Sequence, residues 1–90
     1  MRGRKVPHPF DLETFLRERD SALLSMDEQQ IRAYFLKYNS DAGPSDPDVF
    51  WRGIHKARTA IKTLPMEERQ KSKRWLLDHG SEPMDDGEIP

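Results

Sequence analysis

The clearest pattern in the chain is an apolar stripe between residues 46 and 64. Apolar residues recur there every three or four positions, as they do on one face of an α-helix. They are Phe50, Ile54, Ala57, Ile61 and Leu64. Asp46 is a favourable N-cap, and Pro47 fits the first helical position, where its missing N–H is not needed. We expect a central helix over residues 47–63 that the other helices cover.

Two helices are predicted before this central one. Asp11 can cap a helix over residues 12–23. The apolar side of that helix consists of Leu12, Phe15, Leu16 and Leu23. Ser25 and Glu28 have the spacing of a capping box and predict a second helix over residues 26–38. Its apolar positions are Ile31, Tyr34, Phe35 and Tyr38.

A fourth helix is predicted after the central one. Pro65 disfavours helical geometry at Leu64 and therefore separates the two helices. The fourth helix should run from Pro65 to Asp78 or His79 and stop at Gly80. Its apolar face is short and consists of Met66, Leu76 and Leu77.

These elements predict an all-α fold, a compact bundle of three to four short helices. Residues 10–80 form the single helical domain in this interpretation. Residues 1–9 carry three cations, a glycine and two prolines, and we expect a flexible basic arm there. Residues 81–90 are acidic, and we expect a disordered tail. The alternative is that this tail folds back on a basic surface of the domain.

Composition narrows the functional classes. The chain has 90 residues, of which 34% are apolar and 34% are charged, which suits one small domain. It contains no cysteine, so disulfides, thiolate catalysis and cysteine-ligated zinc are excluded. We see no apolar run of membrane-spanning length and no hydrophobic signal peptide after Met1. We therefore expect a soluble cytoplasmic protein without a membrane partner.

The net charge of −1 conceals a segregation of charges along the chain. Eight cations and two acids lie between Arg52 and Arg74. On the central helix Arg52, Lys56 and Lys62 lie opposite the apolar stripe, while Trp51 and Arg58 lie at its edge. On the fourth helix the cations surround Trp75, which lies opposite the apolar face. The candidate binding residues are Trp51, Arg52, His55, Lys56, Arg58, Lys62, Lys71, Arg74 and Trp75. The basic arm adds Arg2, Arg4 and Lys5.

Two kinds of partner fit this surface, although a solvated face without a partner is the simplest interpretation of such a charge run. Arginine and aromatic residues carry much of the energy of protein interfaces. Our first hypothesis is therefore a non-enzymatic protein that binds a protein partner in fixed stoichiometry. The alternative is a regulatory nucleic-acid-binding protein, since cations neutralise phosphates and basic arms can follow them. The tight Leu64–Pro65 junction leaves a helix-turn-helix open, although the usual turn glycine is missing.

The sequence offers no motif for catalysis or for metal binding. His8, His55 and His79 lie in three separate segments and form no ligand pair. We find no Gly-x-Ser-x-Gly and no glycine-rich phosphate loop. We expect no enzymatic activity, no cofactor and no metal, and the sequence leaves the oligomeric state open.

The stretch FWRGIHKARTAIKTLP, followed by SKRWLLDHG, resembles small uncharacterised proteins of bacteriophage and prophage genomes. The resemblance covers residues 24–87. Its fragments are Ile31–Tyr34, Phe50–Trp51, His55–Arg58, Leu64–Pro65, Trp75–Leu76 and Asp85–Gly87. It implies a bacterial host cytoplasm and a host or phage protein as the partner. It implies no known activity and assigns no site residues.

Overall fold

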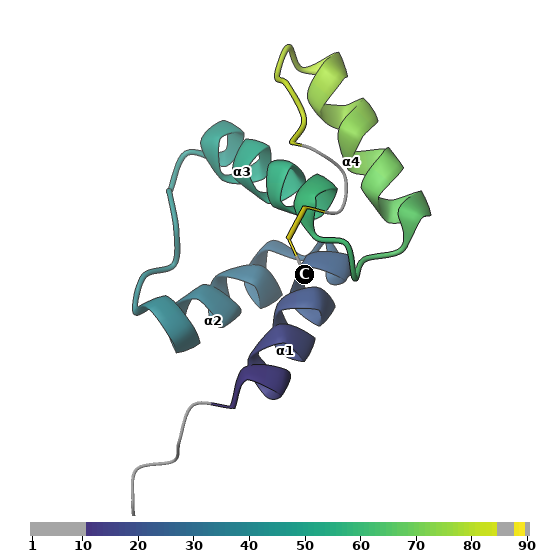
Figure 1. Cartoon of the computed structure of the whole chain (residues 1–90). Helices are drawn as coiled ribbons and strands as arrows, with labels where there is room; N and C mark the ends of the chain where they lie inside the picture. Colours follow the sequence, from purple (N-terminus) through teal and green to yellow (C-terminus); the bar gives the residue numbers. More distant parts are fainter. Residues whose placement is uncertain (1–10, 85–87, 90) are drawn as a thin grey trace, which may run out of the picture.

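The computed structural model describes residues 11–84 and 88–89. This part of the chain contains four helices, α1 (Leu12–Ser25), α2 (Glu28–Asn39), α3 (Pro47–Ala60) and α4 (Met66–Asp78). Each helix packs mainly on its neighbour in sequence, so that α1 pairs with α2 and α3 pairs with α4 (Figure 1). The predicted all-α bundle is confirmed. The predicted basic arm, with Arg2, Arg4 and Lys5, lies outside the described residues.

The junction between α1 and α2 differs from the predicted capping box. Asp27 is the N-cap of α2, and its carboxylate accepts a hydrogen bond from the Gln29 N–H at 2.9 Å. Ser25 is still part of α1, where its hydroxyl donates to the Ala22 carbonyl. Met26 then ends α1 with a left-handed backbone. The capping box is therefore wrong, because Ser25 lies too early to cap α2.

The central helix begins as predicted and ends early. The Asp46 carboxylate accepts a hydrogen bond from the Asp48 N–H at 2.9 Å, and Pro47 is the first helical residue. The helix stops at Ala60 because Ile61 has an extended backbone, with φ −89° and ψ 110°. The segment that links α3 to α4 is therefore longer than the sequence predicted.

Helix α4 has the predicted extent but not the predicted buried face. It ends before Gly80, which has a positive φ of 72° that favours glycine. Leu76 is buried as predicted, whereas Met66 and Leu77 are exposed. Ser72 is buried in their place, so a polar residue forms part of the contact with α3.

The apolar core lies where α3 meets the α1–α2 pair. It consists of Ala22, Leu23, Ile31, Phe50, Ile54, Ile61 and Leu64. The predicted stripe of the central helix therefore points inward, and Ala57 packs against the same cluster. Among the described residues, none of the helices has the length and apolar character needed to cross a bilayer.

The C-terminal segment lies against the end of α3 (Figure 1). Ile89 forms a parallel β-bridge with Ile61, and the Met84 N–H donates to the Thr59 hydroxyl at 3.2 Å. Residues 81–84 and 88–89 thus differ from the predicted disordered tail, while residues 85–87 and 90 lie outside the described part. The segment folds back mainly through main-chain hydrogen bonds, and its Ser81 hydroxyl also contacts the Arg52 guanidinium.

Candidate functional site

The structure does not expose all the residues of the predicted basic surface on one face. Four of its nine residues are exposed, namely Lys56, Lys62, Lys71 and Arg74. Three more are half-buried, namely Trp51, Arg52 and Trp75. His55 and Arg58 are buried, with 5% and 1% of their surface exposed. The predicted binding roles of His55 and Arg58 are therefore wrong, because α4 packs over this side of α3.

Arg58 joins three elements inside the molecule. Its Nη2 donates to the Glu68 carboxylate at 2.5 Å and to the Glu68 carbonyl at 3.3 Å. Its Nη1 contacts the Met26 sulfur at the end of α1. Hydrogen bonds from Lys71 and Arg58 lower the pKa of the Glu68 carboxyl group. Arg58 is thus a structural charge that links α3 to α4 and is closed to a partner.

His55 is also part of the internal contact between α3 and α4. Its Nδ1 lies 2.9 Å from the Ser72 hydroxyl. Burial, with smaller contributions from Arg58 and His79, lowers the pKa of His55 to about 4. His55 is therefore neutral near pH 7 and adds no charge to the surface.

Trp75 stacks between two imidazole rings. Its centroid lies 4.2 Å from that of His55 and 3.7 Å from that of His79, with interplanar angles of 18° and 14°. Two rings this close to one centroid cannot share a face of the indole, so they cover opposite faces. Neither face of Trp75 is then open for a base or a partner side chain.

The half-buried residues of α3 are held by neighbours. The Arg52 Nε pairs with the Asp48 carboxylate at 2.8 Å, and its guanidinium also contacts the Ser81 hydroxyl. Trp51 packs edge-on against Phe50, with ring centroids 5.0 Å apart. Both side chains are therefore fixed on the helix rather than presented to a partner.

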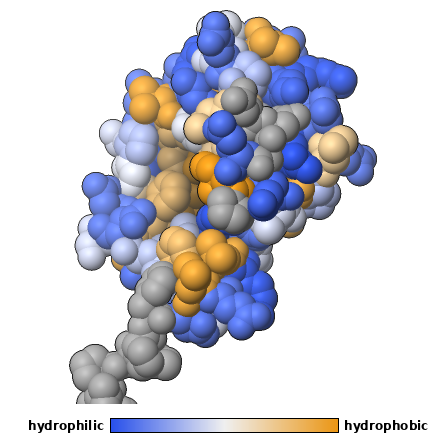
Figure 2. All heavy atoms as spheres, in the orientation of Figure 1, coloured by the Kyte–Doolittle hydropathy of each residue, from blue (hydrophilic) through white to orange (hydrophobic). Residues whose placement is uncertain are grey.

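An open apolar groove lies on the other side of α3, between this helix and the α1–α2 pair. Its volume is about 340 Å³. Its apolar walls include Leu23, Phe35, Phe50, Ile54, Ala57 and Ile61. Figure 2 shows apolar side chains gathered around a hollow in this part of the molecule. Leu23, Phe50, Ile54 and Ile61 are its buried floor and belong to the core, so sequence reasoning identified the core and missed the opening at the exposed Val49 and Gly53.

A row of small residues runs along the α3 side of this groove, beside the larger Phe50 and Ile54. Val49, Gly53 and Ala57 follow one another at intervals of four residues and all line it. A Cβ atom placed on Gly53 meets no atom within 4 Å, and 51% of the Val49 surface is exposed. This series was the signal in the sequence that could have indicated an open face.

Arg32 fixes the loop that closes one end of the groove. Its guanidinium donates to the carbonyls of Ala42 and Pro44, both at 2.9 Å, and pairs with Glu28 at 2.8 Å. It also lies over the Phe50 ring, 4.1 Å from the centroid. The charged network holds the loop in place, so the groove is formed before any partner binds.

The groove has little polar character. Tyr34 lines it, and burial raises the pKa of the Tyr34 hydroxyl to about 12, so this group stays protonated. Arg19 also lines it, with its guanidinium paired to Asp20 at 3.0 Å. Across the described residues, histidine and acidic side chains nowhere gather into a group of three that could hold a metal. The chemistry of the groove therefore suits apolar contact.

Comparison with known proteins identifies no relative, since no protein-family model, no curated protein and no solved structure matches the chain. The resemblance to bacteriophage and prophage proteins therefore stays a prediction.

Proposed function

We propose that this chain is a small non-enzymatic interaction protein that binds a protein partner in fixed stoichiometry. The groove between α3 and the α1–α2 pair is the proposed contact site, and the apolar face of a partner helix is its occupant. The observation that carries this proposal is the open apolar volume of about 340 Å³. Contiguous apolar surface that a small domain leaves open to water is typical of binding sites.

The shape of the groove suits a helix. An amphipathic helix presents apolar side chains at intervals of three and four residues, and such a row can lie along a groove between two helices. The series Val49, Gly53 and Ala57 leaves little side-chain volume on the α3 side. A partner helix can therefore approach the backbone of α3 closely at Gly53.

The charges beside the groove favour acidic residues in the partner. Lys56 and Lys62 are exposed and are adjacent in sequence to Ala57 and Ile61, which line the groove. Cations at the rim of an interface mainly raise the association rate and discriminate between partners. Of the predicted basic surface, Lys56 and Lys62 therefore keep a proposed binding role, which is limited to the rim of the groove.

Nucleic-acid binding is the second candidate, and the exposed cations Lys56, Lys62, Lys71 and Arg74 support it. Two details reduce this support. Lys71 pairs with Glu68 at 3.1 Å, and the faces of Trp75 are covered by imidazoles. A base could not stack on Trp75 without displacing a histidine.

Two variants at Gly53 test the groove. Gly53→Gln places a long neutral side chain in it, whereas Gly53→Ala adds one methyl group in open space. Both residues are better helix formers than glycine, so both variants should be at least as stable as the natural chain. The immobilised chain is used to capture partners from nuclease-treated lysate, and the captured protein is then titrated with purified chain.

The proposal expects Gly53→Ala to bind the captured protein like the natural chain and Gly53→Gln to bind it about tenfold or more weakly, about 1.4 kcal/mol. Equal binding by both variants would exclude the groove as the contact site. Retention that nuclease abolishes, with an affinity that falls steeply as salt rises, would favour the nucleic-acid alternative instead.

A further inference from the structure

We propose that the backbone of residues 59–62 is a second binding site, specific for extended peptides, which the chain's own C-terminal segment occupies. An extended peptide with an acidic residue followed by a β-branched apolar residue is the proposed ligand in trans. Ile61 also lines the helix-binding groove, but this site uses the main chain of residues 59–62, and each proposal has its own variants and can fail independently.

The first observation is the pairing of two main chains. The Ile89 N–H donates to the Ala60 carbonyl at 2.5 Å, and the Lys62 N–H donates to the Ile89 carbonyl at 2.6 Å. This is the pattern of a parallel β-bridge between Ile61 and Ile89. An added strand binds through such main-chain hydrogen bonds, while the side chains supply specificity.

The second observation is that the end of α3 needs this partner. The last carbonyl groups of a helix have no partner inside the helix. Ala60 is the last residue of α3 and is completely buried with the C-terminal segment in place, so its carbonyl needs a protein donor there. The Ile89 N–H supplies the missing donor. Any extended peptide that offers an N–H at this place can do the same.

The third observation concerns side chains. Bridged residues in a sheet place their side chains on the same face, so Ile89 lies beside Ile61. Ile89 remains 37% exposed, which leaves it partly covered by the domain. The site therefore favours an apolar residue of this shape without enclosing it.

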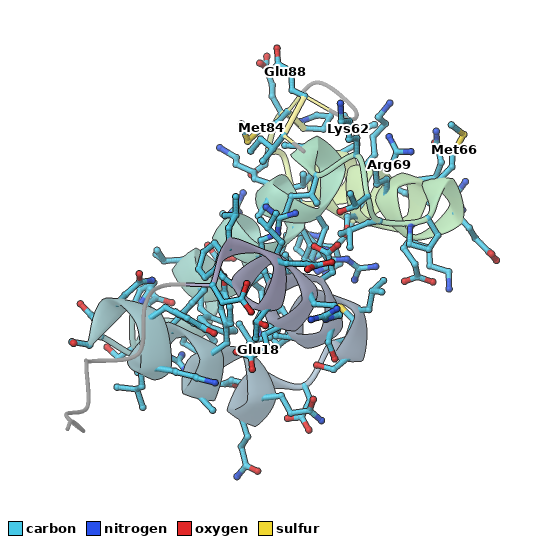
Figure 3. All side chains as sticks on the ribbon, turned by 60° about the horizontal axis from the view of Figure 1, so that its bottom comes forward. Glu18, Lys62, Met66, Arg69, Met84 and Glu88 are labelled. Carbon is cyan, nitrogen blue, oxygen red and sulfur yellow. The ribbon has the colours of Figure 1, made fainter. Side chains whose placement is uncertain are left out.

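The charge of Lys62 and further contacts along the bound segment supply the rest of the specificity. Lys62, Met84 and Glu88 lie at the same end of the molecule (Figure 3), so an acidic residue before the apolar one is favoured there. The Met84 N–H also donates to the buried Thr59 hydroxyl at 3.2 Å. The contacts thus extend over several residues of the bound segment.

The attached segment competes with any free peptide. A short tether holds its end at an effective concentration in the millimolar range. The two main-chain hydrogen bonds and the Ile89 side chain keep the attached segment paired in most molecules at that effective concentration. A free peptide should therefore bind more weakly to the natural chain than to a chain whose own segment cannot pair.

The test uses full-length chains and a fluorescent peptide with the sequence of residues 84–90, MDDGEIP. Ile89→Pro removes the N–H that Ala60 accepts, while Ile89→Val keeps it. By fluorescence anisotropy, the peptide should bind Ile89→Pro about tenfold or more tightly than either the natural chain or Ile89→Val. Amide shifts on binding should fall at residues 59–62.

A second peptide keeps the test decisive whatever the variants do to the fold. It has proline in place of the isoleucine and should bind Ile89→Pro at least about tenfold more weakly than MDDGEIP. Equal binding of the two peptides, binding to neither protein, or amide shifts confined to the groove residues Phe35 and Ile54 would each overturn the proposal.

Discussion

The two helix pairs are held together in different ways. Between α1 and α2 the contact is aromatic, with the Phe15 ring 4.8 Å from Tyr38 and 5.7 Å from Tyr34. Polar contacts in this pair lie near the surface. Between α3 and α4 the contact includes buried polar groups, Arg58 with Glu68 and His55 with Ser72.

This difference determines how each pair responds to damage. When part of an apolar contact is lost, the free energy of unfolding falls roughly in proportion to the surface and volume removed. Loss of one member of a buried polar pair costs more, because the remaining group is left without a partner. We therefore expect the α3–α4 pair to be the more sensitive of the two to single substitutions and to pH.

The largest effect is expected at Arg58. Arg58→Ala removes the largest fully buried side chain and opens a cavity beside Met26, while Glu68 keeps its ion pair with Lys71. We expect the free energy of unfolding to fall by about 3–5 kcal/mol, as for truncation of other large buried side chains. Urea denaturation followed by circular dichroism measures it.

Lys56→Ala is the matched control for this change, since Lys56 is an exposed cation on the same helix. It should change the free energy of unfolding by less than about 0.5 kcal/mol. Arg58→Met, which fills the space without a charge, should recover part of the loss. Equal effects of Arg58→Ala and Lys56→Ala would contradict the structural role of Arg58.

The next effect is a loss of stability in mild acid. The pKa of His55 is about 4 in the folded chain and near 6.5 in the unfolded chain. As the pH falls below 6.5, the unfolded chain binds a proton that the folded chain does not, so the free energy of unfolding falls. The full shift corresponds to about 3 kcal/mol between pH 6.5 and 4.

Chemical denaturation at several pH values between 6.5 and 5 checks this loss, because carboxyl groups contribute less in that window than at lower pH. His55→Gln removes the titrating group and should flatten the pH dependence, whatever its effect on stability at pH 7. An unchanged slope in His55→Gln would assign the acid sensitivity to other groups.

A smaller effect is expected at Ser72. Ser72→Ala removes the hydroxyl that pairs with the buried His55 Nδ1. We expect a loss of about 1–2 kcal/mol, the cost of a buried polar group without a partner. Ser21→Ala, at an exposed serine of α1, serves as the control and should be close to neutral in the same thermal melts.

The smallest effect is expected in the α1–α2 pair. The Tyr38 hydroxyl donates to the Glu18 carboxylate at 2.6 Å, and together with Lys37 this hydrogen bond lowers the pKa of Glu18. Tyr38→Phe should raise the pKa of Glu18 toward its ordinary value of 4.5, with little change in melting temperature. An NMR titration of the Glu18 side chain measures the shift, with Lys37→Ala as the smaller comparison.

Local signals predicted most helix boundaries, although the capping box at Ser25 and Glu28 was wrong. Asp46 with Pro47 at the start of α3, and Gly80 after α4, work through their immediate neighbours. The end of α3 could not be predicted in this way. Ile61 has an extended backbone and pairs with Ile89, far along the sequence.

The candidate site was predicted less well, for a physical reason. A periodic pattern assigns polar residues to water, and His55 and Arg58 were assigned in this manner. Their burial depends on Ser72 and Glu68, which supply partners from another helix. The weak apolar face of α4 was the available hint, because a helix with few apolar residues must use polar ones to pack.

The pairing of sequence neighbours has a consequence for folding speed. Because α1 docks on α2 and α3 on α4, most contacts join residues that are close along the chain. Such a low contact order is typical of domains that fold in microseconds to milliseconds. The bridge between Ile61 and Ile89 and the contacts between α1 and α3, such as Met26 with Arg58, join residues about 30 positions apart and should form after the helix pairs. Stopped-flow or temperature-jump experiments would then detect helix formation before the bridge between Ile61 and Ile89 forms.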